Sequence, residues 1–341
     1  MAGRFLRGRF PRALFLSEYI MLYEFAITPD VFDGSRILRA PEPKVIIWML
    51  QGLFENGLIA NLHDSLWERH ALQRLAQQCP PGVRDKILVC LKTLKDRKRF
   101  IPYPRHQPND PTDDTEWLDL ALDEHRRNPF HAIVLGKDLL AACTPGEPCC
   151  VDLDEILDTA SWQERPQTVA VTKNQASYRS QLTPLLRNTR MLRIIDPYMV
   201  ASKPMCMQTI ELCADLLGRG SHEVVQRRIQ IHTDPTKEPS GLSAVDQLNT
   251  WESVLRPIVA CYGHSFEVFL WSTRTPDYRF HDRFLLTDQC GVGSQDSFEC
   301  VNRNPSTTHW FLLPQDIRQR LIAELRPQTS HYDFMNNRQV V

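Results

Sequence analysis

A histidine, an arginine and an aspartate lie within eight residues of one apolar stretch, at His281, Arg283 and Asp288 in the string RFHDRFLLTD. An arginine stabilises negative charge on phosphate oxygens. A neutral imidazole attacks phosphorus or transfers a proton, and a carboxylate orients the imidazole and stabilises its charged form. The three residues therefore predict a phosphate-handling site. The alternative is an ordinary strand on which Arg283 makes a surface salt bridge.

A strand over residues 280–287 would position these groups. Side chains alternate between the two faces of a strand, so His281 and Arg283 would share one face. Phe284 and Leu286 would share the other face and pack against a helix. Asp288 follows the strand, and we expect the turn QCGVGS after it to swing its carboxylate towards the other two groups.

Further polar residues stand where other predicted strands end. Asp196 and Tyr198 follow the apolar run LRII, and His232 lies near the end of RRIQIHT. Ligand sites of open α/β sheets collect at the carboxyl ends of strands. We therefore take Asp196, Tyr198 and His232 as candidate substrate-binding residues, and add Gly293 and Ser294, whose hydroxyl could donate to a phosphate. Each has a structural alternative, because Asp-Pro is a common turn and a serine often caps one.

The order of the expected elements indicates the fold class. After residue 165, four strands alternate with two helices, which is typical of a mostly parallel sheet with covering helices, in the α/β class. The strands are expected at 192–196, 227–233, 266–271 and 282–287, and the helices at 205–218 and 243–263. We take 165–341 as the catalytic domain.

Residues 1–150 predict a mainly helical accessory domain. Apolar spacing and stop signals indicate five helices and one short buried strand, at 130–135. The helices are expected at 13–30, 45–60, 63–78, 83–97 and 116–126. Two alternatives stay open for this region: a DNA-reading module with a basic helix end at 92–100, and a degenerate first half of a longer catalytic unit.

The string His281-x-Arg283-x4-Asp288 resembles the HxKxxxxD motif of the phospholipase D superfamily. A Gly-Ser pair follows that motif in the family, and Gly293-Ser294 follows it here. The string RIIDPYM, 193–199, resembles the first strand of phospholipase D-like nuclease domains of bacterial proteins. The resemblance covers about residues 170–310. It implies an α/β/α sandwich and phosphodiesterase chemistry that uses a phosphohistidine intermediate and needs neither metal nor cofactor.

Two departures from the family pattern bear on this chemistry. Arg283 replaces the family's lysine, which keeps the charge but exchanges a compact ammonium for a broad planar fork. The family normally uses two motif copies, one for the nucleophile and one for the acid. The nearest second copy, His125 with Arg127, has Ala132 where the aspartate should stand. Single-copy members of the family form homodimers in which two motifs meet, and we expect the same here.

These observations favour a nuclease that hydrolyses DNA or RNA, with DNA favoured. A bacterial anti-phage defence system with companion proteins fits the resemblance. The main alternative is a catalytically inactive scaffold or sensor subunit, which the arginine replacement and the near-neutral charge would suit. A lipid phosphodiesterase is less favoured, because no amphipathic membrane-binding helix or basic lipid patch is evident.

Composition sets the outer bounds. The chain has 341 residues, enough for two domains, and a net charge of −1, so any nucleic-acid site must be a local patch. Its ten cysteines form no CxxC pair and no zinc-type spacing, and we interpret them as reduced thiols. No run of 18 apolar residues occurs, so we expect no membrane span and a cytoplasmic location.

Overall fold

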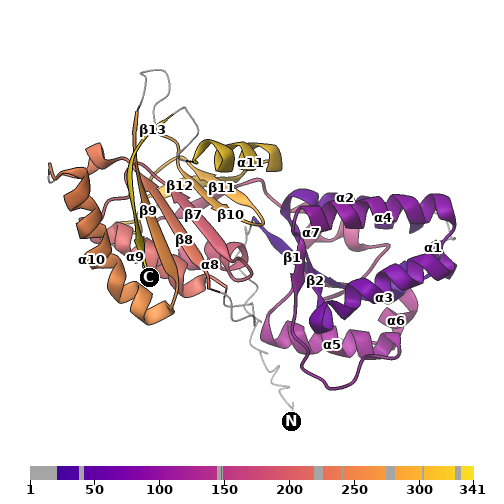
Figure 1. Ribbon diagram of the computed structural model, residues 1–341. Helices are drawn as coiled ribbons and strands as arrows, with labels where there is room; N and C mark the ends of the chain where they lie inside the picture. Colours follow the sequence, from indigo (N-terminus) through magenta and orange to yellow (C-terminus); the bar gives the residue numbers. More distant parts are fainter. Residues whose placement is uncertain are drawn as a thin grey trace, which may run out of the picture.

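The structure is a computed structural model that describes residues 21–37, 42–143, 147, 149–218, 226–239, 241–273, 281–301, 303–326 and 332–341 (Figure 1). The arginine-rich start of the chain lies outside the described residues. The helix predicted at 13–30 is wrong in its described part, because residues 23–27 form a buried strand, β1.

A five-stranded parallel sheet forms the centre of the N-terminal domain, in the order β3-β2-β1-β4-β5. Its strands are short, and β1, β2 and β4 are buried along their whole length. The strands are β1 (Tyr23–Ile27), β2 (Gly57–Asn61), β3 (Phe100–Pro102), β4 (Ala132–Leu135) and β5 (Cys150–Asp152).

Helices cover both faces of this sheet, with α2 and α4 on one side and α3 and α5 on the other (Figure 1). The helices predicted at 63–78, 83–97 and 116–126 are confirmed as α3, α4 and α5. The helices are α1 (Gly34–Ile37), α2 (Glu42–Asn56), α3 (Leu62–Gln78), α4 (Pro81–Asp96), α5 (Asp114–Arg127) and α6 (Lys137–Ala142), with the 3-10 turn η1 (Pro29–Phe32).

The sheet itself is what the sequence did not predict, apart from the strand at 130–135, which is β4. The helical pattern over 45–60, which the sequence itself interrupts near Gly57, ends there: α2 stops at Asn56 and β2 begins at Gly57. A strand buried on both faces reads as a continuous apolar run, and periodicity alone does not separate such a run from a buried helix. The domain is therefore mainly helical by residue count, but it is built around a parallel sheet.

The C-terminal domain holds a mixed eight-stranded sheet in the order β13-β9-β8-β7-β10-β11-β12-β6. Its strands are β6 (Thr168–Thr172), β7 (Met191–Ile195), β8 (Arg228–Thr233), β9 (Ser265–Thr273), β10 (Phe284–Thr287), β11 (Gly291–Ser294), β12 (Thr307–Leu312) and β13 (Tyr332–Val340). The strands predicted at 192–196, 227–233, 266–271 and 282–287 are confirmed as β7, β8, β9 and β10.

The expectation of a mostly parallel sheet is wrong for this domain. Only β7–β8 and β8–β9 pair in parallel, and the other five pairs are antiparallel. For one of these pairs the reason is the turn between β10 and β11, which has only three residues, Asp288–Cys290. So short a connection can join antiparallel strands but not parallel ones.

Helices on both faces make this domain a three-layer α/β/α unit (Figure 1). The helices predicted at 205–218 and 243–263 are confirmed as α9 and α10. One layer contains α8 (Gln175–Leu186), α9 (Pro204–Leu216) and α10 (Ala244–Tyr262). On the other face, α11 (Gln315–Glu324) packs Leu321 and Ile322 near Ile195, Phe269 and Trp271.

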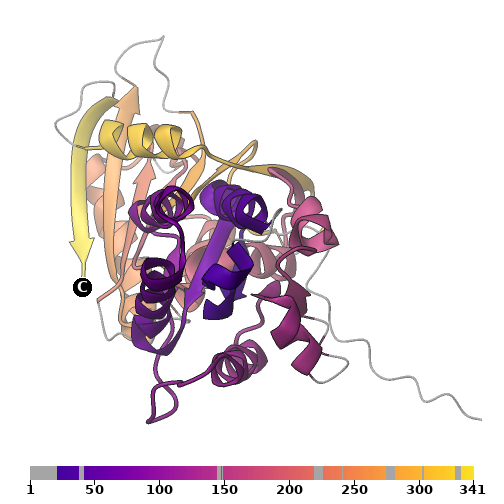
Figure 2. The same ribbon diagram turned by 90° about the vertical axis from the view of Figure 1, so that its right-hand side faces the viewer.

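The segment between β5 and β6 packs against the N-terminal domain. The turn η2 (Ile156–Asp158) contacts α2, and Trp162 of α7 (Ala160–Gln163) lies 5.6 Å from the Phe25 ring, centroid to centroid. Glu24 of β1 forms an ion pair with Arg187, which follows α8. The N-terminal domain lies in front of the C-terminal sheet in Figure 2.

None of the helices in the described ranges combines the length and apolar character needed to cross a membrane.

Candidate active site at the start of strand β10

Strand register brings several predicted site residues to one edge of the C-terminal sheet. β10 runs antiparallel to β7, so Phe284 at its start lies opposite Ile195 at the end of β7. Arg283 and Asp196 are therefore neighbours. β11 runs antiparallel to β10 and ends beside the same point, where the Ser294 N–H donates to the Arg283 carbonyl at 3.0 Å.

Tyr198 is the centre of a small cluster of positive side chains at this edge. The Arg283 guanidinium carbon lies 4.8 Å from the Tyr198 ring centroid, and the Lys237 ammonium lies 5.4 Å from it. The His281 ring stands edge-on to Tyr198, with centroids 6.1 Å apart, and His281 is exposed. Cations are attracted to the faces of aromatic rings. The cluster thus places an exposed imidazole beside two cations.

The strand predicted over 280–287 begins only at Phe284, so His281 and Arg283 precede β10 rather than lie within it. Arg283 Nη1 donates to the Gln295 carbonyl at 2.9 Å. Arg283 Nε is buried, and no described residue accepts a hydrogen bond from it. Within the described ranges its hydrogen-bond partner is thus a backbone carbonyl, not the acid that the salt-bridge alternative requires.

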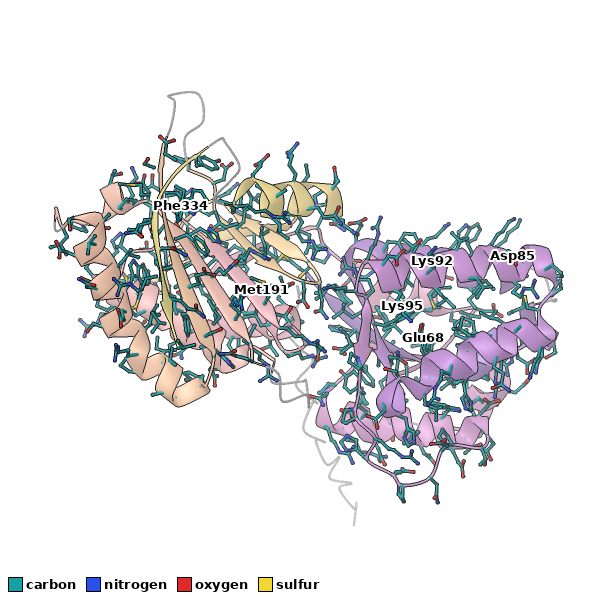
Figure 3. The ribbon with its side chains drawn as sticks, in the orientation of Figure 1. Glu68, Asp85, Lys92, Lys95, Met191 and Phe334 are labelled. Carbon is teal, nitrogen blue, oxygen red and sulfur yellow. The ribbon has the colours of Figure 1, made fainter. Side chains whose placement is uncertain are left out.

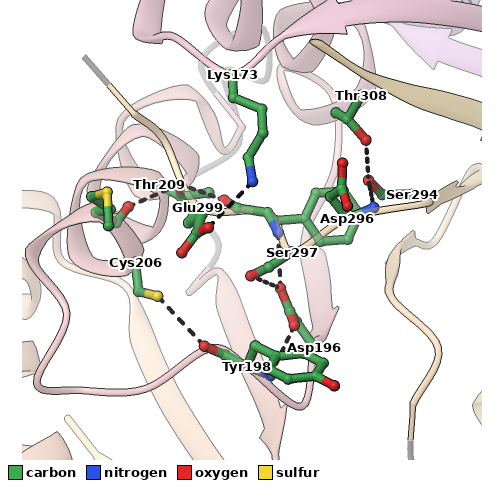
Figure 4. A network of polar contacts seen from close by, with 12 residues as sticks. Lys173, Asp196, Tyr198, Cys206, Thr209, Ser294, Asp296, Ser297, Glu299 and Thr308 are labelled. Atoms are coloured by element: carbon green, nitrogen blue, oxygen red, sulfur yellow. Dashed lines mark hydrogen bonds and ion pairs between the residues drawn. The ribbon is translucent and has the colours of Figure 1, made fainter. Parts of the chain in front are cut away.

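Asp196 ties two segments together beneath this cluster (Figure 4). Its Oδ2 accepts hydrogen bonds from the Ser297 hydroxyl at 2.7 Å and the Phe298 N–H at 2.8 Å, and its Oδ1 accepts from the Tyr198 N–H at 2.9 Å. Asp196 is fully buried. Burial raises its pKa, and the hydrogen bonds and the Arg283 charge work in the opposite direction. Asp196 therefore positions the loop after β11 and holds Tyr198.

Lys173 was not predicted from the sequence; Glu299, a possible orienting partner of His281 by its type, pairs with Lys173 instead. Lys173 follows β6, is buried, and places its Nζ 3.3 Å from Glu299 Oε1, as Figure 4 shows. Thr172 at the end of β6 lies opposite Thr307 of β12, which brings Lys173 to the same edge as Asp196. The available signal was a lysine directly after an alternating apolar run, TVAVT, which was not assigned as a strand.

Asp288 does not join His281 and Arg283, contrary to the expectation from the turn. It lies beyond the other end of β10, and five residues of extended chain separate it from Arg283, a span of about 16 Å. Its carboxylate accepts a hydrogen bond from the Thr189 hydroxyl and lines a cavity between the two domains.

His232 does not line the cluster either. Its ring stacks on Phe269 at 4.7 Å between centroids, and its Nδ1 accepts a hydrogen bond from Trp271 Nε1 at 3.0 Å. Phe269 and Trp271 belong to the face of the sheet that packs against α11. His232 is buried, and burial lowers its pKa to about 3, so the imidazole is neutral at physiological pH.

Gly293 and Ser294 have structural explanations. A Cβ atom at Gly293 would meet the Phe311 ring at 2.3 Å, so the glycine makes room for that ring. The Ser294 hydroxyl accepts a hydrogen bond from the Asp296 N–H at 3.3 Å and lies 3.5 Å from the Thr308 hydroxyl. Ser294 thus caps the turn that leads to Ser297, whose hydroxyl donates to Asp196.

Across the described residues, no group of three or more His, Cys, Asp and Glu side chains is arranged to hold a metal ion. The ten cysteines all lie in the described ranges and form no disulfide.

Comparisons with known proteins identify no family. No protein-family model matches the chain, and no curated protein matches it significantly. Among solved structures, TrmBL2, an archaeal chromatin protein with a novel mode of DNA binding, aligns with a TM-score of 0.26 and 12% sequence identity. The alignment covers 71% of this chain and 79% of that chain. A TM-score this low does not establish a common fold.

Proposed function

We propose that the C-terminal domain is a phospholipase D-like phosphodiesterase that hydrolyses nucleic acid, with DNA favoured, and that His281 is its nucleophile. The observation that carries this proposal is the grouping of exposed His281 with Arg283, Lys237 and Tyr198 where β7 and β11 end and β10 begins. Arg283 Nε is a buried donor with no acceptor in the described ranges. Such a donor calls for a partner, and a phosphate oxygen would supply one.

Four other side chains, Arg283, Lys237, Asp196 and Tyr198, have distinct tasks in this mechanism. The Arg283 guanidinium stabilises charge as it develops on the phosphate oxygens. Lys237 adds positive charge at the same surface. Asp196 does not touch the reacting atoms; it fixes Tyr198 and the loop after β11 through three hydrogen bonds. An aromatic ring beside two cations also offers a face on which a base can stack.

The acid that protonates the leaving group comes from a second copy of the chain in this proposal. His232 and His264 are two alternatives within the chain, and both are buried with lowered pKa values. His264 Nε2 is also hydrogen-bonded to the Ala214 carbonyl at 3.0 Å. A symmetric homodimer would bring two exposed His281 side chains together across one cleft.

The test uses labelled single-stranded and double-stranded DNA and RNA, with chelator present. We expect wild-type protein to cleave at least one of them, and His281→Ala to lower the rate by about 10⁴-fold or more, as when a nucleophile is removed. His309→Ala is the matched control, because His309 is also exposed and lies on β12. Cleavage that requires magnesium and persists in His281→Ala would overturn the mechanism.

Dimer formation has its own test. Wild-type chains are mixed with excess His281→Ala chains under conditions of subunit exchange, and the activity is measured. Each composite site needs two His281 side chains, so we expect activity to fall further than dilution alone explains. An active protein that sediments as a monomer at assay concentration would contradict the shared site.

A non-catalytic scaffold remains the second candidate, favoured by one observation. Arg283 already contacts the Gln295 carbonyl and the Tyr198 ring, as a structural arginine does. In that case the protein binds nucleic acid without cleaving it, and Arg283→Ala weakens the binding. Binding without turnover in the assay above would select this candidate.

A further inference from the structure

A cavity of about 350 Å³ lies between the N-terminal and C-terminal domains. Asn188 and Arg190, which precede β7, form part of its wall together with Asp288 and Gln289 after β10. The opposite wall comes from α3, α4 and the ends of β2 and β3. Small-molecule sites have volumes of roughly 300–1,000 Å³. The cavity therefore has room for one small molecule.

The wall from the N-terminal domain follows the edge strand β3, whose three residues all line the cavity, to the carboxyl ends of β2 and β3. Asn61 and Pro102, which both line the cavity, are the last residues of the parallel strands β2 and β3. Ligands of open α/β sheets bind outside the carboxyl ends of their strands. Directly after β2, His63, Asp64 and Ser65 have φ values of 57°, 53° and 68°, and Ser65 lines the cavity. Non-glycine residues with such strained backbones collect at ligand sites.

The charged side chains of the cavity favour an anion. Its lining carries three positive side chains, Lys95, Lys98 and Arg190, and two negative ones, Glu68 and Asp288. Lys95 Nζ lies 2.6 Å from Glu68 Oε1, and the two side chains face one another between α4 and α3 in Figure 3. The second acid, Asp288, accepts the Thr189 hydroxyl. Positive charge thus exceeds negative charge in the lining.

Gln289 supplies an independent sign of a ligand. It lines the cavity and is 4% exposed, and its Nε2 donates to the Asn188 carbonyl at 3.4 Å. Its Oε1 is buried, and no donor to it exists among the described residues. A buried acceptor in a polar cavity requires a donor, because leaving it unpaired is costly.

We propose that this cavity binds a nucleoside monophosphate. Lys98 and Arg190 hold the phosphate. Gln289 Oε1 accepts a hydrogen bond from an amino or hydroxyl group of the nucleoside, and Asp288 accepts from the ribose hydroxyls. The half-buried Phe100 ring gives an apolar wall for the base. This site is separate from the His281 cluster and does not depend on the proposed phosphodiesterase activity.

Titration calorimetry of the full chain with AMP, GMP, CMP and UMP tests the proposal. We expect saturable binding of at least one of them at one site per chain. Lys98→Asn and Arg190→Gln each weaken it about tenfold, the effect of losing one charge-assisted hydrogen bond. Asparagine suits position 98, because the backbone there has a φ of 56°. Lys92→Gln, on α4 outside the cavity, is the matched control and binds as wild type does (Figure 3).

Three results would overturn the proposal: no saturable binding of any of the four nucleotides at millimolar concentration, equal affinity for inorganic phosphate, or loss of binding in His281→Ala. The last would assign the nucleotide to the other site. Thermal melting of each variant separates lost binding from lost folding, and Arg190→Gln provides a second variant if Lys98→Asn unfolds. A 5′-phosphorylated oligonucleotide that competes with AMP would assign the site to a strand end; one that does not compete would assign it to free nucleotide.

Discussion

The two ends of strand β10 differ in kind, although one short sequence string supplies both. At its start, the exposed His281 and the half-buried Arg283 gather around Tyr198 above the buried Asp196 network. At its end, Asp288 lies in a cavity between the domains. Although Arg283 and Asp288 are close in sequence, the extended strand between them holds them apart, since each residue of extended chain adds about 3.3 Å. Residues from different strands came together instead.

Pairing decides which residues meet at each end. Because β7 and β11 both run antiparallel to β10, Asp196 after β7 and Ser294 at the end of β11 lie beside the start of β10. The same pairing carries the segment before β7 to the end of β10, where the Thr189 hydroxyl meets Asp288. If this division is functional, variants at the start of β10 should change turnover and variants at its end should not.

After His281→Ala, the largest expected effect is also at the start of β10. Arg283→Ala should lower the rate of phosphodiester hydrolysis by about 10²–10³-fold, the effect of removing one donor to a developing oxyanion. Arg283→Lys should recover part of the activity, because lysine keeps the charge but loses the paired donors. Single-turnover kinetics with excess protein measures both. A wild-type rate in Arg283→Ala would remove the start of β10 from the chemistry.

The next effect is on stability at the same end. Asp196→Ala should lower the free energy of unfolding by about 3 kcal/mol or more, because three donors, two of them in buried hydrogen bonds, lose their acceptor at once. Asp96→Ala, at the exposed end of α4, should change it by less than about 0.5 kcal/mol. Urea denaturation measures the difference. Equal midpoints for the two variants would show that the Asp196 network does not hold this end together.

Much of the C-terminal domain could be predicted because its elements carry strong local signals. The helix at 243–263 has a serine cap and a terminal glycine, Ser243 and Gly263, and the structure uses both. The strand at 192–196 stops at Pro197. The strands β6, β11, β12 and β13 were not assigned from the sequence, and the antiparallel pairs that they form were therefore not predicted.

The candidate site was predicted only in part for the same reason. Tyr198, Asp196, Arg283 and His281 lie on or beside elements that the sequence revealed, and the structure brings them together. Lys173 follows a strand that was not assigned. His232 was placed correctly at a strand end, but the face on which its side chain lies depends on register, and a shift of one residue reverses that face.

The third expected effect is on the pH dependence of stability, and it concerns His232, which lies opposite Ile195 near the start of β10. His232 is buried and neutral, with a pKa of about 3, whereas an unfolded histidine titrates near 6.5. Between these values the unfolded chain binds a proton that the folded chain does not, so stability falls as the pH falls. From pH 7 to pH 5 the loss should be about 2 kcal/mol. His232→Gln keeps an acceptor for Trp271 and should remove this part of the pH dependence. Identical pH profiles for the two proteins would contradict the burial of a neutral His232.

The smallest expected effect belongs to the end of β10. Asp288→Asn should change the turnover of nucleic acid by less than about threefold, because the carboxylate is about 16 Å of strand away from Arg283. The asparagine carbonyl can still accept the Thr189 hydroxyl, so the turn after β10 is retained. The measurement compares Asp288→Asn with Arg283→Ala in one single-turnover assay without added mononucleotide. If Asp288→Asn lost as much activity as Arg283→Ala, the two ends of β10 would have to act together. Asp288 would then belong to the catalytic site after all, through the second chain of a dimer or a rearrangement of the β10–β11 turn.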